Sequence, residues 1–122
     1  MIDRVAPIAL VATLLAASVA VAEPRLVTNI EMCAFDDPID TQEMGMELDA
    51  TSMSEIEYYC EFSDAVDLHW DEDRTVTRAG YCSEPGFILP TVFALQMNPY
   101  EPGIVRVWQQ GGEEPVEFRQ CP

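Results

Sequence analysis

Apolar and polar residues alternate along several short segments of this chain of 122 residues, and this period of two constrains its fold more than any other feature. The clearest segments run from Met44 to Ala50, from Ile56 to Phe62 and from Val66 to Trp70. Because alternate side chains of a pleated strand point to opposite faces, each segment would bury an apolar row and expose a polar, mostly acidic row. Each of these segments is therefore predicted to be a half-buried β-strand.

Other segments are rich in β-branched, aromatic or aliphatic residues but alternate less regularly. They are residues 26–35, 75–82, 87–97, 104–108 and 116–118. Residues 26–35 fit either a strand or a helical turn. The stretch from Phe87 to Met97 is apolar on both faces, which predicts a central, fully buried strand, with a short helix from Thr91 to Met97 as the alternative. Pro90 inside this stretch indicates a bend or an edge position.

Clusters of Gly, Pro, Asp and Asn separate the predicted strands at regular intervals. These clusters are residues 71–73, 83–86, 98–103 and 111–115. Such residues favour turns, because Gly permits a positive φ, Pro presets its own φ and Asp or Asn side chains bond to the backbone. The longest surface loop is predicted from Asp36 to Glu43. The fold class is therefore predicted to be all-β, a small antiparallel sandwich or barrel of roughly six to eight short strands.

The first 22 residues have the pattern of a secretory signal peptide. Arg4 lies in a short polar head, an apolar stretch follows from Val5 to Val21, and the small residues Ala20-Val21-Ala22 fit a signal peptidase site. We expect a helical signal peptide at residues 1–22 that is cleaved, leaving a single exported β-domain at residues 23–122, periplasmic or extracellular and free of the membrane. The alternative is an uncleaved anchor, although about 18 alanine-rich residues make a short, weakly apolar span.

The four cysteines are Cys33, Cys60, Cys82 and Cys121. An even number of cysteines in an exported chain indicates two disulfides, and four cysteines allow three pairings. We favour Cys33–Cys121 with Cys60–Cys82, because a bond from the penultimate residue to the first strand would hold both ends of the domain together. No two cysteines have the close spacing of a zinc site, so neither a metal nor another cofactor is expected.

The chain is strongly acidic, with 22 Asp and Glu residues, six arginines, no lysine and a formal net charge of −16. This balance disfavours binding to nucleic acids or to anionic membranes, since both require a cationic surface. An acidic surface attracts a cationic protein or peptide, which is the partner that the charge indicates. The alternative is adaptation of an exported protein to external salt, where carboxylates maintain solubility.

Catalytic and metal-binding patterns are weak. His69 is the only histidine, and it lies on the polar face of its predicted strand without a recognisable nucleophile motif. Residues 67–78 have the alternate acidic spacing of a calcium loop, but Glu72 occupies the position that requires glycine and Arg78 the position of the bidentate glutamate. No catalytic residue and no metal ligand is therefore assigned.

The residue types that concentrate at binding hot spots are Trp, Tyr and Arg, and four of them are candidates for binding. They are Tyr100, Arg106, Trp108 and Trp70. Arg106 and Trp108 share a strand face, so the guanidinium could lie over the indole. Tyr100 lies in a proline-rich turn, where a rigid, exposed aromatic side chain is expected. The alternative for the tryptophans is ordinary core packing, with Arg106 covering the ring of Trp108.

Three classes of function fit these features. The first is a non-catalytic, exported binding or inhibitor-like module that recognises a basic protein, such as a secreted hydrolase. The second is a small hydrolase that uses paired carboxylates, although a chain with 22 acidic residues always offers such pairs. The third is an envelope or structural domain without a discrete ligand. We rank them in this order, because small size, disulfides and rigid turns all suit a binding module.

Overall fold

The computed structural model describes residues 11–14 and 24–122. Residues 11–14 have no regular secondary structure, and the rest of the expected signal peptide lies outside the described residues. In the described ranges, no helix has both the length and the apolar character needed to cross a membrane.

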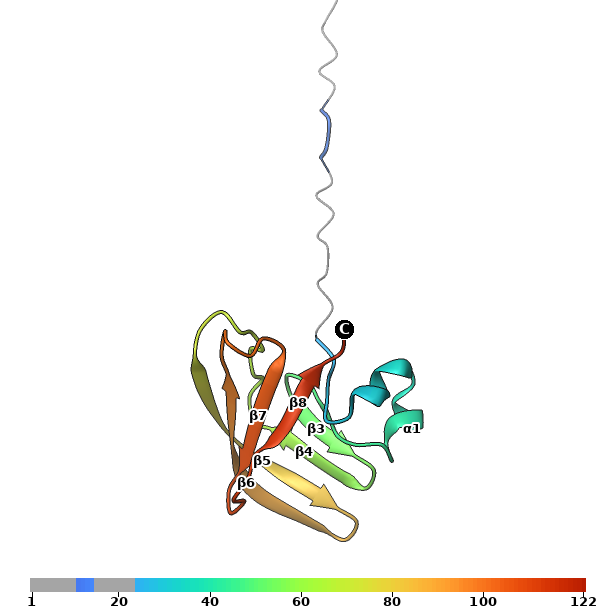
Figure 1. Cartoon of the computed structure of the whole chain (residues 1–122), viewed down its shortest axis with the longest axis vertical. Coiled ribbons are helices and arrows are strands. Elements are labelled where there is room, and N and C mark those ends of the chain that lie inside the picture. The colour runs from blue at the N-terminus through green and yellow to red at the C-terminus, as the bar shows by residue number, and fades with distance from the viewer. Residues whose placement is uncertain (1–10, 15–23) are drawn as a thin grey trace, which may run out of the picture.

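Within the described residues, eight antiparallel strands close into a barrel, in which each strand pairs with the next and β8 pairs with β1 (Figure 1). The strands are β1 (Leu26–Val27), β2 (Glu47–Leu48), β3 (Ser52–Glu55), β4 (Tyr58–Phe62), β5 (Arg74–Glu84), β6 (Phe87–Met97), β7 (Ile104–Gln109) and β8 (Val116–Gln120). A 3₁₀ helix, η1 (Ile30–Ala34), and a single helical turn, α1 (Pro38–Thr41), lie between β1 and β2. The predicted all-β class is confirmed, and of the two predicted architectures the barrel is the one that forms.

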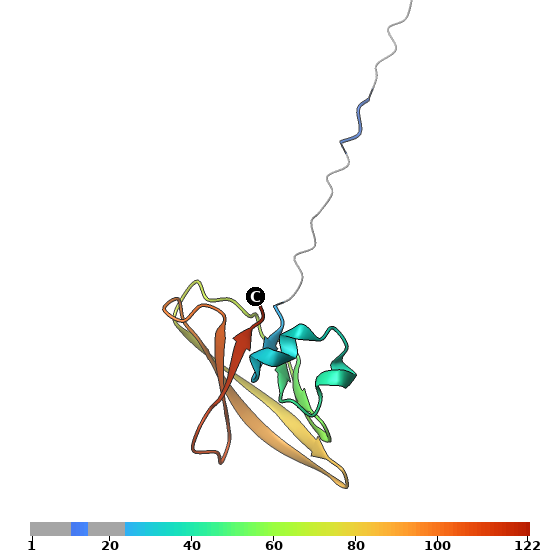
Figure 2. The same cartoon turned by 45° about the vertical axis from the view of Figure 1, so that its right-hand side comes forward.

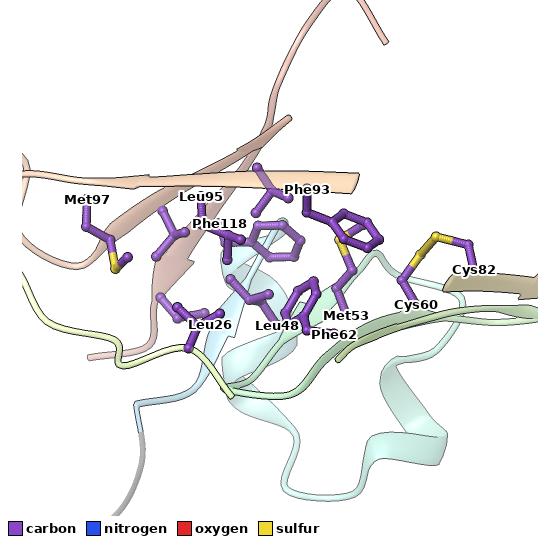
Figure 3. Packing of buried hydrophobic residues seen from close by; sticks show 13 residues of the cluster. Leu26, Leu48, Met53, Cys60, Phe62, Cys82, Phe93, Leu95, Met97 and Phe118 are labelled. Atoms are coloured by element: carbon purple, nitrogen blue, oxygen red, sulfur yellow. A yellow bond between two sulfur atoms is a disulfide. The ribbon is translucent and has the colours of Figure 1, made fainter. Parts of the chain in front are cut away.

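The barrel interior is filled by the inward-facing side chains of the strands, as is usual for a barrel of this size. Phe62 of β4 and Phe93 of β6 meet edge to face, with ring centroids 5.0 Å apart (Figure 3). The other buried members of this cluster are Leu26, Leu48, Met53, Cys60, Val66, Cys82, Leu95, Met97, Val105, Val107 and Phe118. These residues come from all eight strands and from position 66, so every strand of the barrel contributes to the core.

Both predicted disulfides are present. Cys33 in η1 bonds to Cys121 after β8, with a Cα–Cα distance of 5.6 Å, and thus links the two ends of the described domain. Cys60 of β4 bonds to Cys82 directly opposite on β5, with a Cα–Cα distance of 4.0 Å. This second bond lies at one end of the core cluster (Figure 3). Of the three possible pairings, the predicted one is therefore confirmed.

The segment from Val66 to Trp70 is not a strand, which corrects the prediction from its alternation. Its apolar side chains nevertheless face the core, and Val66 is buried. Its backbone is held by single contacts: the N–H of Val66 donates to the carbonyl of Ala50, and Nη1 of Arg74 donates to the carbonyl of Asp67. Apolar and polar residues therefore alternate in this segment because its apolar side chains cover the core. Its backbone does not form the regular hydrogen bonds of a β-sheet.

Strands β5 and β6 are far longer than their neighbours and extend beyond them as a hairpin (Figure 2). Strand β6 pairs with β7 only between Phe93 and Gln96, so residues 87–92 have a strand partner on the β5 side alone. The prediction of a fully buried strand from Phe87 to Met97 is therefore wrong for its first half, and the alternative helix from Thr91 does not form. The edge position predicted from Pro90 is confirmed.

Candidate functional site

The outward face of the β5–β6 hairpin carries no charged residue. On β6 the buried residues Thr91, Phe93, Leu95 and Met97 face the interior, so the residues between them face outward. Ten outward residues form five cross-strand pairs: Thr75–Gln96, Thr77–Ala94, Ala79–Val92, Tyr81–Pro90 and Ser83–Ile88. We call these ten residues the neutral face. In a chain with 22 acidic residues, such a continuous uncharged surface is unusual and requires an explanation.

The charged residues of β5 lie on the other side of the strand. Arg74 and Arg78 face inward, where their guanidinium groups donate to backbone carbonyls of the segment that covers the core. For Arg78 the acceptor is the carbonyl of Ala65, at 3.2 Å from Nη2. The alternation of β5 therefore keeps both positive charges away from the neutral face.

The end of the hairpin is apolar on both sides. Phe87, Ile88 and Leu89 expose 55%, 68% and 53% of their surface, and they follow the turn residues Pro85 and Gly86. We call residues 85–89 the hairpin tip. Three consecutive, half-exposed large apolar residues at the end of a projecting hairpin are typical of a contact surface.

The open edge of β6 is protected against pairing with another strand. The carbonyl of Val92 accepts from the N–H of Gln110, so the backbone groups of Val92 point to the β7 side. The backbone groups of Pro90 and Ile88 point in the same direction, because these residues lie two and four positions before Val92. They therefore face the open edge, where β6 has no strand partner. Since Pro90 has no N–H, it interrupts the row of donors that an added strand would need. The hairpin thus offers its side chains for binding, and Pro90 opposes binding through its backbone.

Trp108 lines an open pocket of about 450 Å³ beside the neutral face. Across the strand pair, its partner is the small residue Ala94, and Trp108 is half-buried. Thr77 and Val92 of the neutral face line the same pocket, and the turn after β7 completes it through Gly111 and Gly112. The structure therefore places Trp108 where an external group can reach its ring.

Carboxylates lie near the neutral face, and one of them contacts it. Glu61 lies next to Tyr81, and the Tyr81 hydroxyl donates to Glu61 Oε2 at 2.7 Å, a hydrogen bond that raises the pKa of Tyr81. Glu84 is exposed at the end of β5, and Glu113 and Glu114 are exposed directly after the pocket residue Gly112. The surface therefore has an uncharged centre with charged neighbours: Glu61 lies beside Tyr81, and Arg106, which is paired with carboxylates, lies beside Gln96.

Arg106 shares the outward face of β7 with Trp108, as predicted, but its guanidinium is held by carboxylates. Nη1 and Nη2 both donate to Glu101, the second at 2.9 Å from Oε1, and Nη2 also lies 3.3 Å from Oε2 of Glu117. The hydrogen bond with Arg106 lowers the pKa of Glu101, and the bond with Glu101 raises the pKa of Arg106. Arg106 is thus part of an ion-pair network that joins the β6–β7 turn to β8.

We expect Glu101→Gln to destabilise the protein at neutral pH and to have little effect in acid. Because folding lowers the pKa of Glu101 from its ordinary value of 4.5, its stabilising contribution is complete above that value. The contribution is lost as the pH falls through the lowered pKa of the folded state. Urea unfolding of both proteins at several pH values would measure this difference.

The matched control is Glu113→Gln, which removes the same charge from an exposed turn where the described residues form no ion pair with it. If both variants change the stability equally at every pH, only the net charge matters and the Arg106 network contributes nothing specific.

The other two predicted binding residues lie apart from this surface. Tyr100 is 91% exposed in the β6–β7 turn, at the opposite end of β6 from the hairpin tip, and Asn98 Oδ1 fixes the turn by accepting from the backbone N–H of Tyr100. This confirms the exposed aromatic side chain. Trp70 packs against the core cluster, and its Nε1 donates to the carbonyl of Ile104 at 2.7 Å. The structure therefore brings Arg106 and Trp108 together and leaves Tyr100 and Trp70 elsewhere.

His69 is flanked by two acidic side chains. Its ring nitrogens lie 3.7 Å from a carboxylate oxygen of Asp67 and 3.8 Å from one of Asp71. Across residues 11–14 and 24–122, no group of three or more His, Cys, Asp or Glu side chains is placed to hold a metal ion.

The sequence interpretation missed the neutral face and the hairpin tip. The signal was present, because the odd-numbered residues from Thr75 to Ser83 are all uncharged while acidic residues fill the equivalent polar rows of other segments. The candidate site therefore consists of the neutral face, the hairpin tip and the Trp108 pocket. No protein-family model, no curated protein and no solved structure matches this chain.

Proposed function

We propose that this protein is an exported, non-catalytic binding module and that its partner is a basic protein. The observation that carries the proposal is the neutral face, whose ten outward residues are all uncharged in a chain with a net charge of −16. Protein interfaces commonly have a centre depleted of charge and a polar rim. The neutral face, the hairpin tip and the nearby carboxylates have this arrangement.

The neutral face is too small to form a stable interface without the residues around it. Two adjacent strands over nine residues present roughly 250 Å², whereas a stable interface needs about 800 Å² from each partner. A partner must therefore extend beyond the neutral face, where Glu61 lies beside Tyr81 and the exposed Glu113 and Glu114 follow the pocket residue Gly112. Complementarity then requires basic residues around an apolar patch on the partner. A second copy of this chain would bring its own carboxylates, which opposes self-association.

The location of the protein is part of the same proposal. Its two disulfides are compatible with an oxidising compartment. Together with the expected signal peptide at residues 1–22, they support export to the periplasm or to the extracellular space. A binding module in either place would meet secreted proteins, among which a basic one would be attracted by the net charge of −16.

The test is a selection of random displayed peptides on the immobilised, oxidised protein at physiological salt. We expect the enriched peptides to combine basic residues with aromatic or aliphatic ones. Selection on the double variant Ala79→Glu and Val92→Glu, which places two charges in the centre of the neutral face, should not enrich these peptides.

The matched control adds the same two charges elsewhere, at the exposed residues Ala34 and Ala65. This control variant should retain the peptides, and circular dichroism should show that both variants remain folded. The proposal fails if no peptide family is enriched, or if the neutral-face variant selects the same peptides as the unaltered protein.

A further inference from the structure

The Trp108 pocket combines a half-buried aromatic residue with a lining that carries no charge. Trp108 faces outward on β7 beside Ala94, and Gly111 and Gly112 add no side chains to the pocket wall. The backbone of Gly111 has a positive φ of 86°, a conformation that suits glycine, so the turn that opens the pocket depends on this residue. The pocket is therefore open because part of its wall consists of small residues. None of its lining side chains carries a charge.

The positive charges in the described part of the chain are already engaged in hydrogen bonds. Each of its five described arginines donates to a carboxylate or a backbone carbonyl: Arg25 to Glu47, Arg74 to Asp67, Arg78 to Ala65 and Thr77, Arg106 to Glu101, and Arg119 to Glu117. The chain contains no lysine. Within the described residues, no arginine lines the Trp108 pocket, so a cation that stacks on Trp108 is expected to come from another molecule.

We propose that the Trp108 pocket receives an arginine side chain of the partner. A guanidinium group stacks on an indole face through the cation–π interaction, and its planar edge can donate to nearby oxygen atoms. The hydroxyl of Thr77 and the amide oxygen of Gln110 are acceptors among the lining residues, and the exposed Glu113 and Glu114 follow the lining residue Gly112 in the chain. The net charge of −16 adds a long-range attraction for the same cation. This inference rests on the proposed function and names the partner group that the pocket would recognise.

The pocket is also large enough to admit a side chain. About 450 Å³ lies at the lower end of the range for small-ligand sites, and the pocket is continuous with the neutral face through Thr77 and Val92. An arginine there would be joined to a partner residue that lies on the neutral face. The apolar centre and the cation site thus act as adjacent parts of one surface.

The test is an NMR titration of the isotope-labelled protein with N-acetyl-L-argininamide, followed through the indole N–H signals. The protein has two tryptophans, and Trp70 provides an internal reference because its N–H is held by the carbonyl of Ile104. We expect a saturable shift of the Trp108 signal, no shift of the Trp70 signal, and loss of the Trp108 shift at high salt. The citrulline analogue has nearly the same shape without the charge, and it should bind about tenfold more weakly.

Three outcomes overturn the inference: no shift with the arginine compound, an equal shift with the citrulline compound, or an equal shift of both indoles. A stronger response to N-acetyl-L-lysinamide would also overturn the assignment to arginine.

A second measurement distinguishes this failure from failure of the proposed function. If the peptides selected above bind Trp108→Leu as well as the unaltered protein but do not bind the neutral-face variant, the binding function stands and the arginine site does not. If they bind neither variant, and the citrulline control behaves as expected, both proposals are supported.

Discussion

Replacement of Cys33 and Cys121 by alanine is expected to lower the free energy of unfolding by about 4–5 kcal/mol. The two cysteines are 88 residues apart, so the bond restricts almost the whole described domain in its unfolded state. The cost of closing such a long loop is removed from folding when the bond is present, and the chain-entropy relation gives the stated magnitude. Urea unfolding of the oxidised protein and of the double variant would measure the difference.

The second disulfide provides the matched control. Cys60 and Cys82 are 22 residues apart, and the same relation gives about 3–3.5 kcal/mol for their bond. The Cys33–Cys121 variant should therefore be the less stable of the two by about 1 kcal/mol. If the order is reversed, the loss of packing around the buried Cys60 and Cys82 outweighs loop length, and the entropic account is wrong for this protein.

The barrel could be predicted because its strands alternate where one face is buried. In the segment from Ile56 to Phe62, the inward row includes Cys60 and Phe62, which the structure buries as strand β4. The pairing of Cys33 with Cys121 is predicted because it would hold the two ends of the domain together, and in the structure β1 pairs with β8 near this bond. Both predictions depend on local pattern together with chain position.

The hairpin could not be predicted from the same pattern. An apolar stretch such as Phe87 to Leu89 is predicted to be buried, because the sequence does not show where a strand extends beyond the barrel. In the structure, the interior begins at Thr91, and the residues before it have no core to enter. The prediction of a strand from Val66 to Trp70 was wrong for the opposite reason. The apolar side chains of this segment pack on the core, although the segment is not paired with a neighbouring strand. Tertiary context decides both cases.

The candidate site could be predicted in part. The period of two correctly placed Arg106 and Trp108 on one face of β7, but it could not show that Glu101 and Glu117 engage the guanidinium. It also could not distinguish Trp70, which packs on the core, from Trp108, which lines a pocket. Residue type alone suggests a hot spot, whereas the neighbours of each side chain decide its availability.

Two phenylalanines on the same side of β6 should separate the stability of the barrel from its binding. Phe93→Ala is expected to lower the free energy of unfolding by about 3–5 kcal/mol, because Phe93 is fully buried and packs against Phe62. Phe87→Ala makes the same change at a side chain that is 55% exposed, so its effect should be within about 0.5 kcal/mol. Urea unfolding of the two variants at one pH would provide the comparison.

The affinity for the selected peptides should respond to these two substitutions in the opposite way. Phe87 lies in the hairpin tip, so Phe87→Ala should weaken the affinity for the selected peptides by about tenfold, as is typical of an aromatic anchor. Phe93→Ala should retain that affinity under conditions where the variant is folded, because Phe93 lies at the base of the Trp108 pocket with a side chain that is fully buried in the barrel interior. A large loss of stability in Phe87→Ala would show that the tip is held by packing, since only a structural role would explain it. Unchanged peptide affinity in that variant would instead confine binding to the neutral face, and the projecting tip would then need a different explanation.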